Sequence, residues 1–255
     1  MNKYNVHAAY FSPTNGTKRA VSLLAEYLDD EYKLIDLTDK SKRDKKFKFS
    51  NNELVIVACP VYAGQIPMID GLFKNLIGDN TPCIVMAAYG NRHYDDAVAQ
   101  MKCILEKNHF KCIGAIASII PHIYSNKLGV GRPDVDDIRI IKSFANEIKK
   151  KLENENFDNV EVPGNPSPSI LQNIPGCNIP KFMDKSLCNS CELCSKECPV
   201  GAINSETNEI DNTLCINCMK CSFVCKTEAR KFDDTMISEY LEGNYTKRRE
   251  IQVFI

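Results

Sequence analysis

The 255-residue sequence has no tryptophan, almost no net charge and no long apolar run. Its 32 Lys and Arg residues nearly balance 33 Asp and Glu residues, so nothing in its charge favours nucleic acid or an anionic membrane. No stretch approaches the roughly 18 apolar residues of a membrane-spanning helix. The first residues also lack the apolar segment of a secretory signal peptide. We therefore expect a cytoplasmic protein that binds neither nucleic acid nor membrane.

Cysteine, by contrast, is abundant, with 13 residues. Eight of them form two runs of spacing C-x2-C-x2-C-x3-C, and the second run, which begins at Cys215, repeats the first, which begins at Cys188. Disulfide frameworks are typical of small secreted chains, and a zinc ribbon leaves the third Cys of each run without a role. The spacing favours [4Fe–4S] ligation. The other five are scattered, and they are Cys59, Cys83, Cys103, Cys112 and Cys177. Four of these five have the apolar surroundings of core residues.

The stretch from Asp184 to Phe232 resembles a bacterial two-cluster ferredoxin. In those proteins the fourth Cys of each run ligates the other cluster. The resemblance implies one cluster held by Cys188, Cys191, Cys194 and Cys225, and a second held by Cys215, Cys218, Cys221 and Cys198. Pro199 follows the first run as it does in the family, whereas Lys226 follows the second run in place of a proline.

The chain before this stretch alternates between strand-like and helix-like patterns. Apolar runs predict strands at 5–10, 33–37, 54–58, 83–88 and 112–120. Helices are expected at 17–28, after Pro67 to about Gly78, at 95–107 and at 133–152. This alternation predicts an α/β doubly wound domain with a five-stranded parallel sheet.

The predicted organisation has four parts. Residues 1–153 form the α/β domain, and a proline-extended linker covers 154–183. A small α+β ferredoxin domain covers 184–232, and a tail covers 233–255. We expect a short helix near 236–241 in the tail, and the apolar residues Val253–Ile255 to dock on a surface that the sequence does not identify.

A charged run, 40–48, lies between the second and third predicted strands. Such runs are usually solvated loops. The alternative is a docking patch for an acidic electron-transfer partner, and the sequence leaves both interpretations open.

The loop after the first strand carries hydroxyl and small residues at the start of a helix. Backbone amides at a helix N-terminus favour an anion. The loop lacks the first glycine of a Walker motif and is not G-x-G-x-x-G. It is similar to the FMN phosphate loop of flavodoxins, although an unliganded helix cap remains an alternative. Its predicted phosphate-binding residues are Ser12, Thr14, Asn15, Gly16 and Thr17.

Two further loops follow the third and fourth predicted strands and leave the same edge of the sheet. The corresponding loops of flavodoxins hold the isoalloxazine ring, so the resemblance implies that Tyr62 and Tyr89 stack on it. Other predicted contacts are Pro60, Val61, Ala63, Gly64, Gly90, Asn91 and Arg92.

The whole chain resembles the flavodoxin–ferredoxin fusion proteins of anaerobes. The motifs that carry this resemblance are P-V-Y-A-G-Q-I-P at 60–67, A-Y-G-N-R at 88–92, G-R-P-D at 131–134 and the eight-Cys repeat. The resemblance implies FMN and two [4Fe–4S] clusters. The resemblance does not determine whether the protein is an enzyme, which reaction it would catalyse or which oligomeric state it has.

Two functions fit these cofactors. The first is an electron carrier that converts between one-electron and two-electron chemistry and exchanges electrons with a ferredoxin-like protein or a reductase. The second is a ferredoxin-dependent flavin reductase of a small quinone- or enoate-like substrate. For the second, the loop 121–133 offers His122, Tyr124, Ser125 and Arg132 as contacts. The same loop could instead seat the ferredoxin domain. No NAD(P)H motif is recognised.

Overall fold

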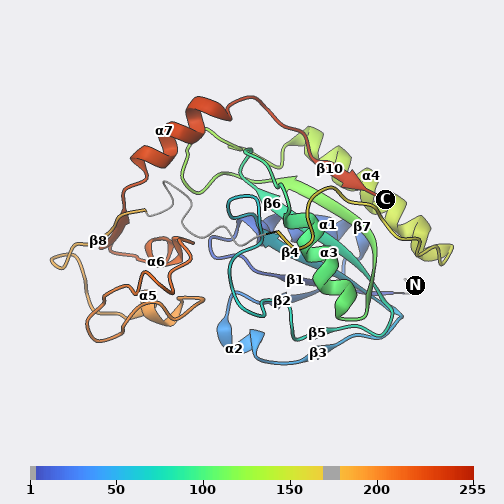
Figure 1. Ribbon diagram of the computed structural model, residues 1–255, viewed down its shortest axis with the longest axis horizontal. Helices are drawn as coiled ribbons and strands as arrows, with labels where there is room; N and C mark the ends of the chain where they lie inside the picture. The colour runs from blue at the N-terminus through green and yellow to red at the C-terminus, as the bar shows by residue number, and fades with distance from the viewer. Residues whose placement is uncertain (1–3, 169–178) are drawn as a thin grey trace.

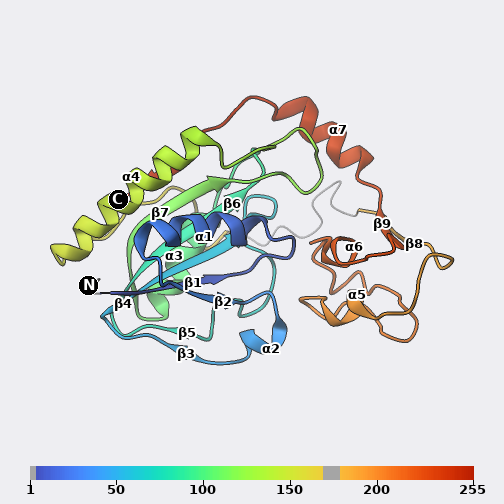
Figure 2. The same ribbon diagram turned by 180° about the vertical axis from the view of Figure 1, so that it is seen from behind.

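The computed structural model describes residues 4–168 and 179–255. An α/β domain takes up most of the chain, and a small cysteine-rich lobe lies beside it (Figures 1 and 2). Cys177 and the middle of the predicted linker lie outside the described residues. No helix in the described part has both the length and the hydropathy required to cross a membrane.

The central sheet has six strands in the order β10-β7-β6-β4-β1-β2. Five of them are parallel and match the five predicted strands: β1 (Asn5–Tyr10), β2 (Lys33–Asp36), β4 (Glu53–Pro60), β6 (Thr81–Tyr89) and β7 (Phe110–Ile119). Counted along the chain, their order is 2-1-3-4-5, which is the flavodoxin-like arrangement. The sixth strand, β10 (Gln252–Phe254), is antiparallel to β7 and was not predicted.

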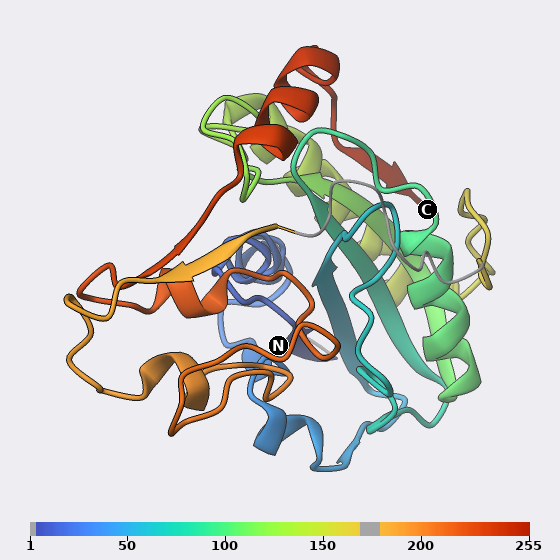
Figure 3. The same ribbon diagram turned by 60° about the vertical axis from the view of Figure 1, so that its left-hand side comes forward.

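Helices cover both faces of the sheet. Helix α1 (Gly16–Leu28) packs with α4 (Val135–Glu153), while α3 (Ala97–Lys107) lies on the other side of the strands (Figure 3). Each face has its own apolar core, one including Leu24 and Phe144, the other including Met101 and Leu105. Because both faces are covered, β6 is buried along its whole length.

The helix predicted after Pro67 is wrong. Residues 67–69 are irregular, residues 70–75 form turns, and the chain continues into β5 (Leu76–Ile77), which pairs with β3 (Phe47–Lys48). Gly71 adopts a positive φ of 63°, which a helix interior does not allow. The apolar side chains that suggested a helix fill the core on the α3 face instead; they are Leu72, Phe73 and Leu76.

The cysteine-rich lobe contains two short helices, α5 (Leu193–Lys196) and α6 (Lys220–Phe223), and the antiparallel pair β8 (Lys181–Met183) and β9 (Arg230–Phe232). Its backbone follows the sequence repeat. Glu192 and Met219, at equivalent positions, are left-handed at φ 59° and 55°, and each precedes a short helix. The two cysteine runs therefore fold in the same way.

The tail returns from the lobe to the sheet. Helix α7 (Thr235–Asn244) contains the predicted short helix, and the following segment runs back to β10 (Figure 1). Val253 and Phe254 pair with Ile116 and Ala115 of β7, while Ile251 is buried in the core under α1 and α4. The apolar C-terminus thus docks on the sheet edge that β7 would otherwise leave open.

Candidate functional site at the carboxyl edge of the sheet

The loops that follow β1, β4, β6 and β7 leave the sheet at one edge, and the cysteine-rich lobe lies at that edge (Figure 1). The strand order reverses between β1 and β4, because the chain moves from β1 outward to β2 and then returns to the other side of β1. Open α/β sheets bind ligands at such a point. The phosphate loop and the loop after β4 flank it.

The phosphate loop has the backbone of an anion site. Asn15 is left-handed at φ 65° and its side chain does not cap α1. The Ser12 amide donates to Thr38 Oγ1 at 2.8 Å, and Ser12 Oγ accepts from the Lys18 amide at 3.0 Å. Among the described residues, the amides of Gly16 and Thr17 have no partner. These open amides fit a phosphate.

The loop after β4 turns back on itself. Tyr62 and Gln65 exchange two backbone hydrogen bonds of 2.8 and 3.0 Å, and the turn between them has positive φ at Ala63 and Gly64. Burial, and then the neighbouring Cys218 and Tyr124 groups, raise the pKa of Tyr62 well above its ordinary value. Tyr62 is therefore placed between the sheet edge and the cysteine-rich lobe.

The loop after β6 contacts the tail. Asn91 Nδ2 donates to the carbonyls of Tyr245 at 2.6 Å and Lys247 at 3.0 Å, and Asn91 Oδ1 accepts from the Arg249 amide at 3.2 Å. Arg92 pairs with Asp95 and lies 6.0 Å from the centroid of the Tyr245 ring. These two side chains, expected beside a flavin ring, hold the tail.

The two tyrosines predicted to stack differ in their surroundings. Tyr89 is buried in the core and meets Tyr94 edge-on, with 5.7 Å between ring centroids. Tyr62 is half-buried at the carboxyl edge. Of the pair, Tyr62 is the more exposed.

The loop 121–133 is occupied by contacts within the chain. Tyr124 Oη donates to the carbonyl of Asn217 in the lobe, and Ser125 Oγ donates to Glu242 Oε1 of α7 at 2.8 Å. Arg132 forms a buried pair with Asp137 and donates to the Arg249 carbonyl at 3.1 Å. The loop therefore seats the lobe and the tail, as the second interpretation of its sequence expected.

His122 packs against the loop after β6. A Cβ atom at Gly90 would lie 2.3 Å from His122 Cδ2, so only glycine fits there. Burial lowers the pKa of His122 to about 4, and its Nδ1 accepts from the Tyr124 amide at 3.1 Å. At pH 7 the imidazole is neutral and its Nδ1 is already engaged.

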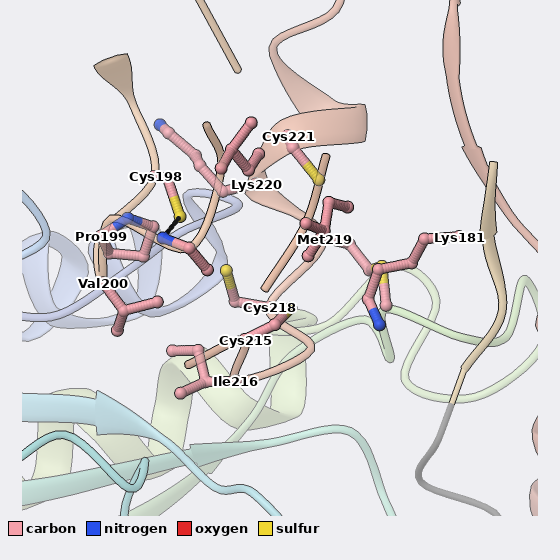
Figure 4. A pocket seen from close by; sticks show the side chains of 13 residues that line it. Lys181, Cys198, Pro199, Val200, Cys215, Ile216, Cys218, Met219, Lys220 and Cys221 are labelled. Atoms are coloured by element: carbon pink, nitrogen blue, oxygen red, sulfur yellow. Dashed lines mark hydrogen bonds between the residues drawn. The ribbon is translucent and has the colours of Figure 1, made fainter. Parts of the chain in front are cut away.

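Four cysteines of the lobe surround one cavity (Figure 4). They are Cys198, Cys215, Cys218 and Cys221, and they come from both runs, in the crossed combination expected for the second cluster. In the other predicted set, Cys188 accepts from the Ser190 amide at 3.4 Å, and Cys191 is exposed. Thiols spaced around a common centre fit a cubane cluster. Among residues 4–168 and 179–255, no three His, Cys, Asp or Glu side chains are grouped to hold a single metal ion, so the four thiols fit a multi-iron cluster and not one ion.

The lobe contacts the α/β domain through the second cysteine run. Ile216, between two of the cysteines, packs against the apolar core of the α3 face, as does Val61 of the loop after β4. Arg43 donates to the Pro199 carbonyl, and also to the Leu37 carbonyl at 2.8 Å. The charged run 40–48 is therefore not wholly solvated, because Arg43 is buried and holds the chain's own lobe. Sequence reasoning missed this role, since the run offers no local signal for it.

Comparison with known proteins finds a match for the first cysteine run, because residues 182–204 match the 4Fe-4S binding domain family. No curated protein matches the chain. Among solved structures, rubredoxin oxygen:oxidoreductase from the anaerobe Desulfovibrio gigas is similar at 17% identity and a TM-score of 0.42, over 60% of this chain and only 38% of that one. The Streptococcus pneumonia TIGR4 flavodoxin is similar at 16% identity and a TM-score of 0.40, over 57% of this chain and 98% of that one. A putative flavoprotein from Bacteroides eggerthii DSM 20697 is similar at 13% identity and a TM-score of 0.37, over 56% and 97%.

The flavodoxin-like fold follows from the order of the five parallel strands. The cluster-binding segment and the flavodoxin-like order of the sheet together indicate an electron-transfer protein. The chain is a fusion of a flavodoxin-like α/β domain with a C-terminal ferredoxin-type 4Fe-4S domain.

Proposed function

We propose that the protein transfers electrons internally between two [4Fe–4S] clusters and FMN, and thereby acts as an electron carrier. When bound, FMN takes up one or two electrons and each cluster takes up one, so the combination converts between the two kinds of chemistry. The chain's own residues would bind these groups, fix the distance between them and exclude water.

Two clusters are supported by the internal repeat of the lobe. The family match covers the first cysteine run, and the second run has the same spacing and the same left-handed positions before its short helix. Cys198 shares a cavity with three cysteines of the second run, as the exchange of fourth ligands requires. The remaining ligands would be Cys188, Cys191, Cys194 and Cys225.

The observation that carries the proposal is the contact between the predicted flavin loop and the second cysteine run. Tyr62 neighbours Cys218 and Cys215, and Ile216 packs on the same core as Val61. A cluster held by this run would lie next to a flavin held at the switch point. Cys218 is buried, whereas Cys191 of the other set is exposed. We infer that the outer cluster meets the partner protein and the inner cluster meets the flavin.

A flavin reductase is the second candidate, and one pocket favours it. It has a volume of about 330 Å³, within the range of small-molecule sites, and adjoins the flavin loops. Its lining residues are Ala63, Gln65, Arg92, Asp95, Asp96, Asn165 and Pro168. His122, which is neutral at pH 7, does not line it.

The test uses full-length protein purified without oxygen. We expect about eight irons, eight labile sulfides and one FMN per chain, as two cubanes and one flavin demand. The protein is then mixed with a one-electron donor in a stopped-flow instrument, while cluster and flavin absorbance are followed separately. Internal transfer is supported if the clusters bleach first and the flavin is then reduced at a rate that does not depend on protein concentration.

Flavin reduction that depends on protein concentration, or that persists unchanged when the clusters are absent, would refute internal transfer. The two functions are separated by adding quinones, enoates and oxidised carrier proteins to the reduced protein. Rapid reoxidation by carriers alone supports the carrier. Saturable turnover of one small molecule, lost in Asp95→Asn and Arg92→Gln with FMN retained, would support the reductase.

A further inference from the structure

Arg230, on β9, is buried inside the cysteine-rich lobe. Its side chain is 6% exposed, and its Nη2 donates to the Asn208 carbonyl at 2.6 Å. Among the described residues, no carboxylate forms an ion pair with it. Arginine stays charged in proteins, and a buried charge without a counter-ion is costly. The lobe therefore contains a fixed positive charge whose negative partner has to come from another group.

A cysteine of a predicted cluster site lies beside this charge. Arg230 Nη2 lies 3.7 Å from Cys194 Sγ, a ligand in the predicted outer set. The guanidinium thus faces a predicted cluster ligand.

The backbone of Arg230 contacts the second cysteine run, next to Cys221, a ligand in the predicted inner set. The Arg230 carbonyl accepts from Ser222 Oγ at 2.9 Å, which ties β9 to α6. Residue 230 is therefore held by both halves of the repeat, and its position cannot change without affecting both.

We propose that Arg230 is a shared electrostatic element that raises the reduction potential of both clusters. This inference rests on the two-cluster proposal above. Cysteine-ligated clusters become more negative on reduction, so a buried cation stabilises the reduced form, and burial prevents solvent from screening it.

The test compares Arg230→Gln with Lys231→Gln in the cluster-loaded full chain. Lys231 is the adjacent residue of β9 and is exposed, so its variant removes an equal charge that water already screens. Redox titrations followed by EPR give the potential of each cluster. We expect Arg230→Gln to lower the reduced-to-oxidised ratio of both clusters at least tenfold at a fixed solution potential, about 59 mV for one electron. Lys231→Gln should change the ratio less than twofold.

A shift in Arg230→Gln no larger than that of Lys231→Gln would overturn the proposal, and a shift in only one cluster would overturn the shared role. If Arg230→Gln does not retain its iron, Arg230→Lys provides the test, because it keeps the charge but loses the fork geometry. Both reduced-to-oxidised ratios should then stay within about twofold of those of the unmodified protein, and a tenfold loss in spite of the retained charge would refute the proposal. Fewer than eight irons in the unmodified protein would instead refute the two-cluster function itself.

Discussion

The buried pair of Arg132 and Asp137 gives the most sharply defined prediction for stability. Their side chains are only 5% and 0% exposed, and two hydrogen bonds join them. Asp137 Oδ2 also accepts from the Asp134 amide at 2.9 Å and so completes the cap of α4. In Asp137→Asn, the amide oxygen can keep the cap, but the amide nitrogen then faces a guanidinium donor. The buried arginine charge then keeps only its longer contact with Asp134, at 3.5 Å from Nε to Oδ2.

Removing one partner of a buried ion pair costs about 3–5 kcal/mol of unfolding free energy. With a urea m-value of about 2–3 kcal/mol/M, the midpoint should fall by about 1–2.5 M. The assay is anaerobic urea unfolding followed by far-UV circular dichroism. The matched control is Asp136→Asn, one residue earlier, which breaks the Arg139–Asp136 pair at 73% and 63% exposure. Exposed pairs contribute about 0–1 kcal/mol, so the control should move the midpoint little.

The same variant tests the role of Arg132. Its Nη1 holds the Arg249 carbonyl of the tail, so loosening Arg132 should speed tryptic cleavage at Arg248 and Arg249. A midpoint shift no larger than that of Asp136→Asn would refute a structural role. Lost turnover of a small substrate with an unchanged midpoint would instead return Arg132 to the substrate-binding role that its sequence position suggested.

Three further predictions concern the cofactor sites. Thr14→Val combined with Thr17→Val should weaken FMN binding by about 1.5–3 kcal/mol per lost hydrogen bond to phosphate, and unchanged affinity by fluorescence titration would place the phosphate elsewhere. Arg43→Met removes the contact with the Pro199 carbonyl and should slow cluster-to-flavin transfer without loss of iron. The control Lys42→Met changes an exposed position and should not slow the transfer. Equal rates in the two variants would contradict the role of Arg43 in holding the lobe. The folded-state pKa of His122 is about 4, below its ordinary value of 6.5. The neutral imidazole therefore favours folding above pH 6.5, and this contribution is lost as the pH falls toward 4. Between pH 7 and pH 5, the denaturant midpoint should consequently fall less in His122→Gln than in the unmodified protein.

The sequence by itself determined the features that depend on local spacing. Three cysteines, each separated from the next by two residues, can ligate one cluster from a short segment of chain. The spacing of Cys188, Cys191 and Cys194 was therefore sufficient to indicate iron–sulfur chemistry. The five parallel strands were likewise readable, because a strand buried on both faces is a nearly continuous apolar run. The same local reasoning failed after Pro67, where apolar residues 72, 73 and 76 resemble a helix face but fill the core from a turn and from β5.

Tertiary structure decided what depends on residues far apart in the chain. Asn91 and Arg132 have the residue types and the loop positions of ligand contacts, yet their polar atoms bind the tail more than a hundred residues later. Arg43 looked like part of a solvated run, but the lobe returns to cover it. A polar side chain takes the partner that satisfies it once water is excluded, and only the packed chain determines which partner that is.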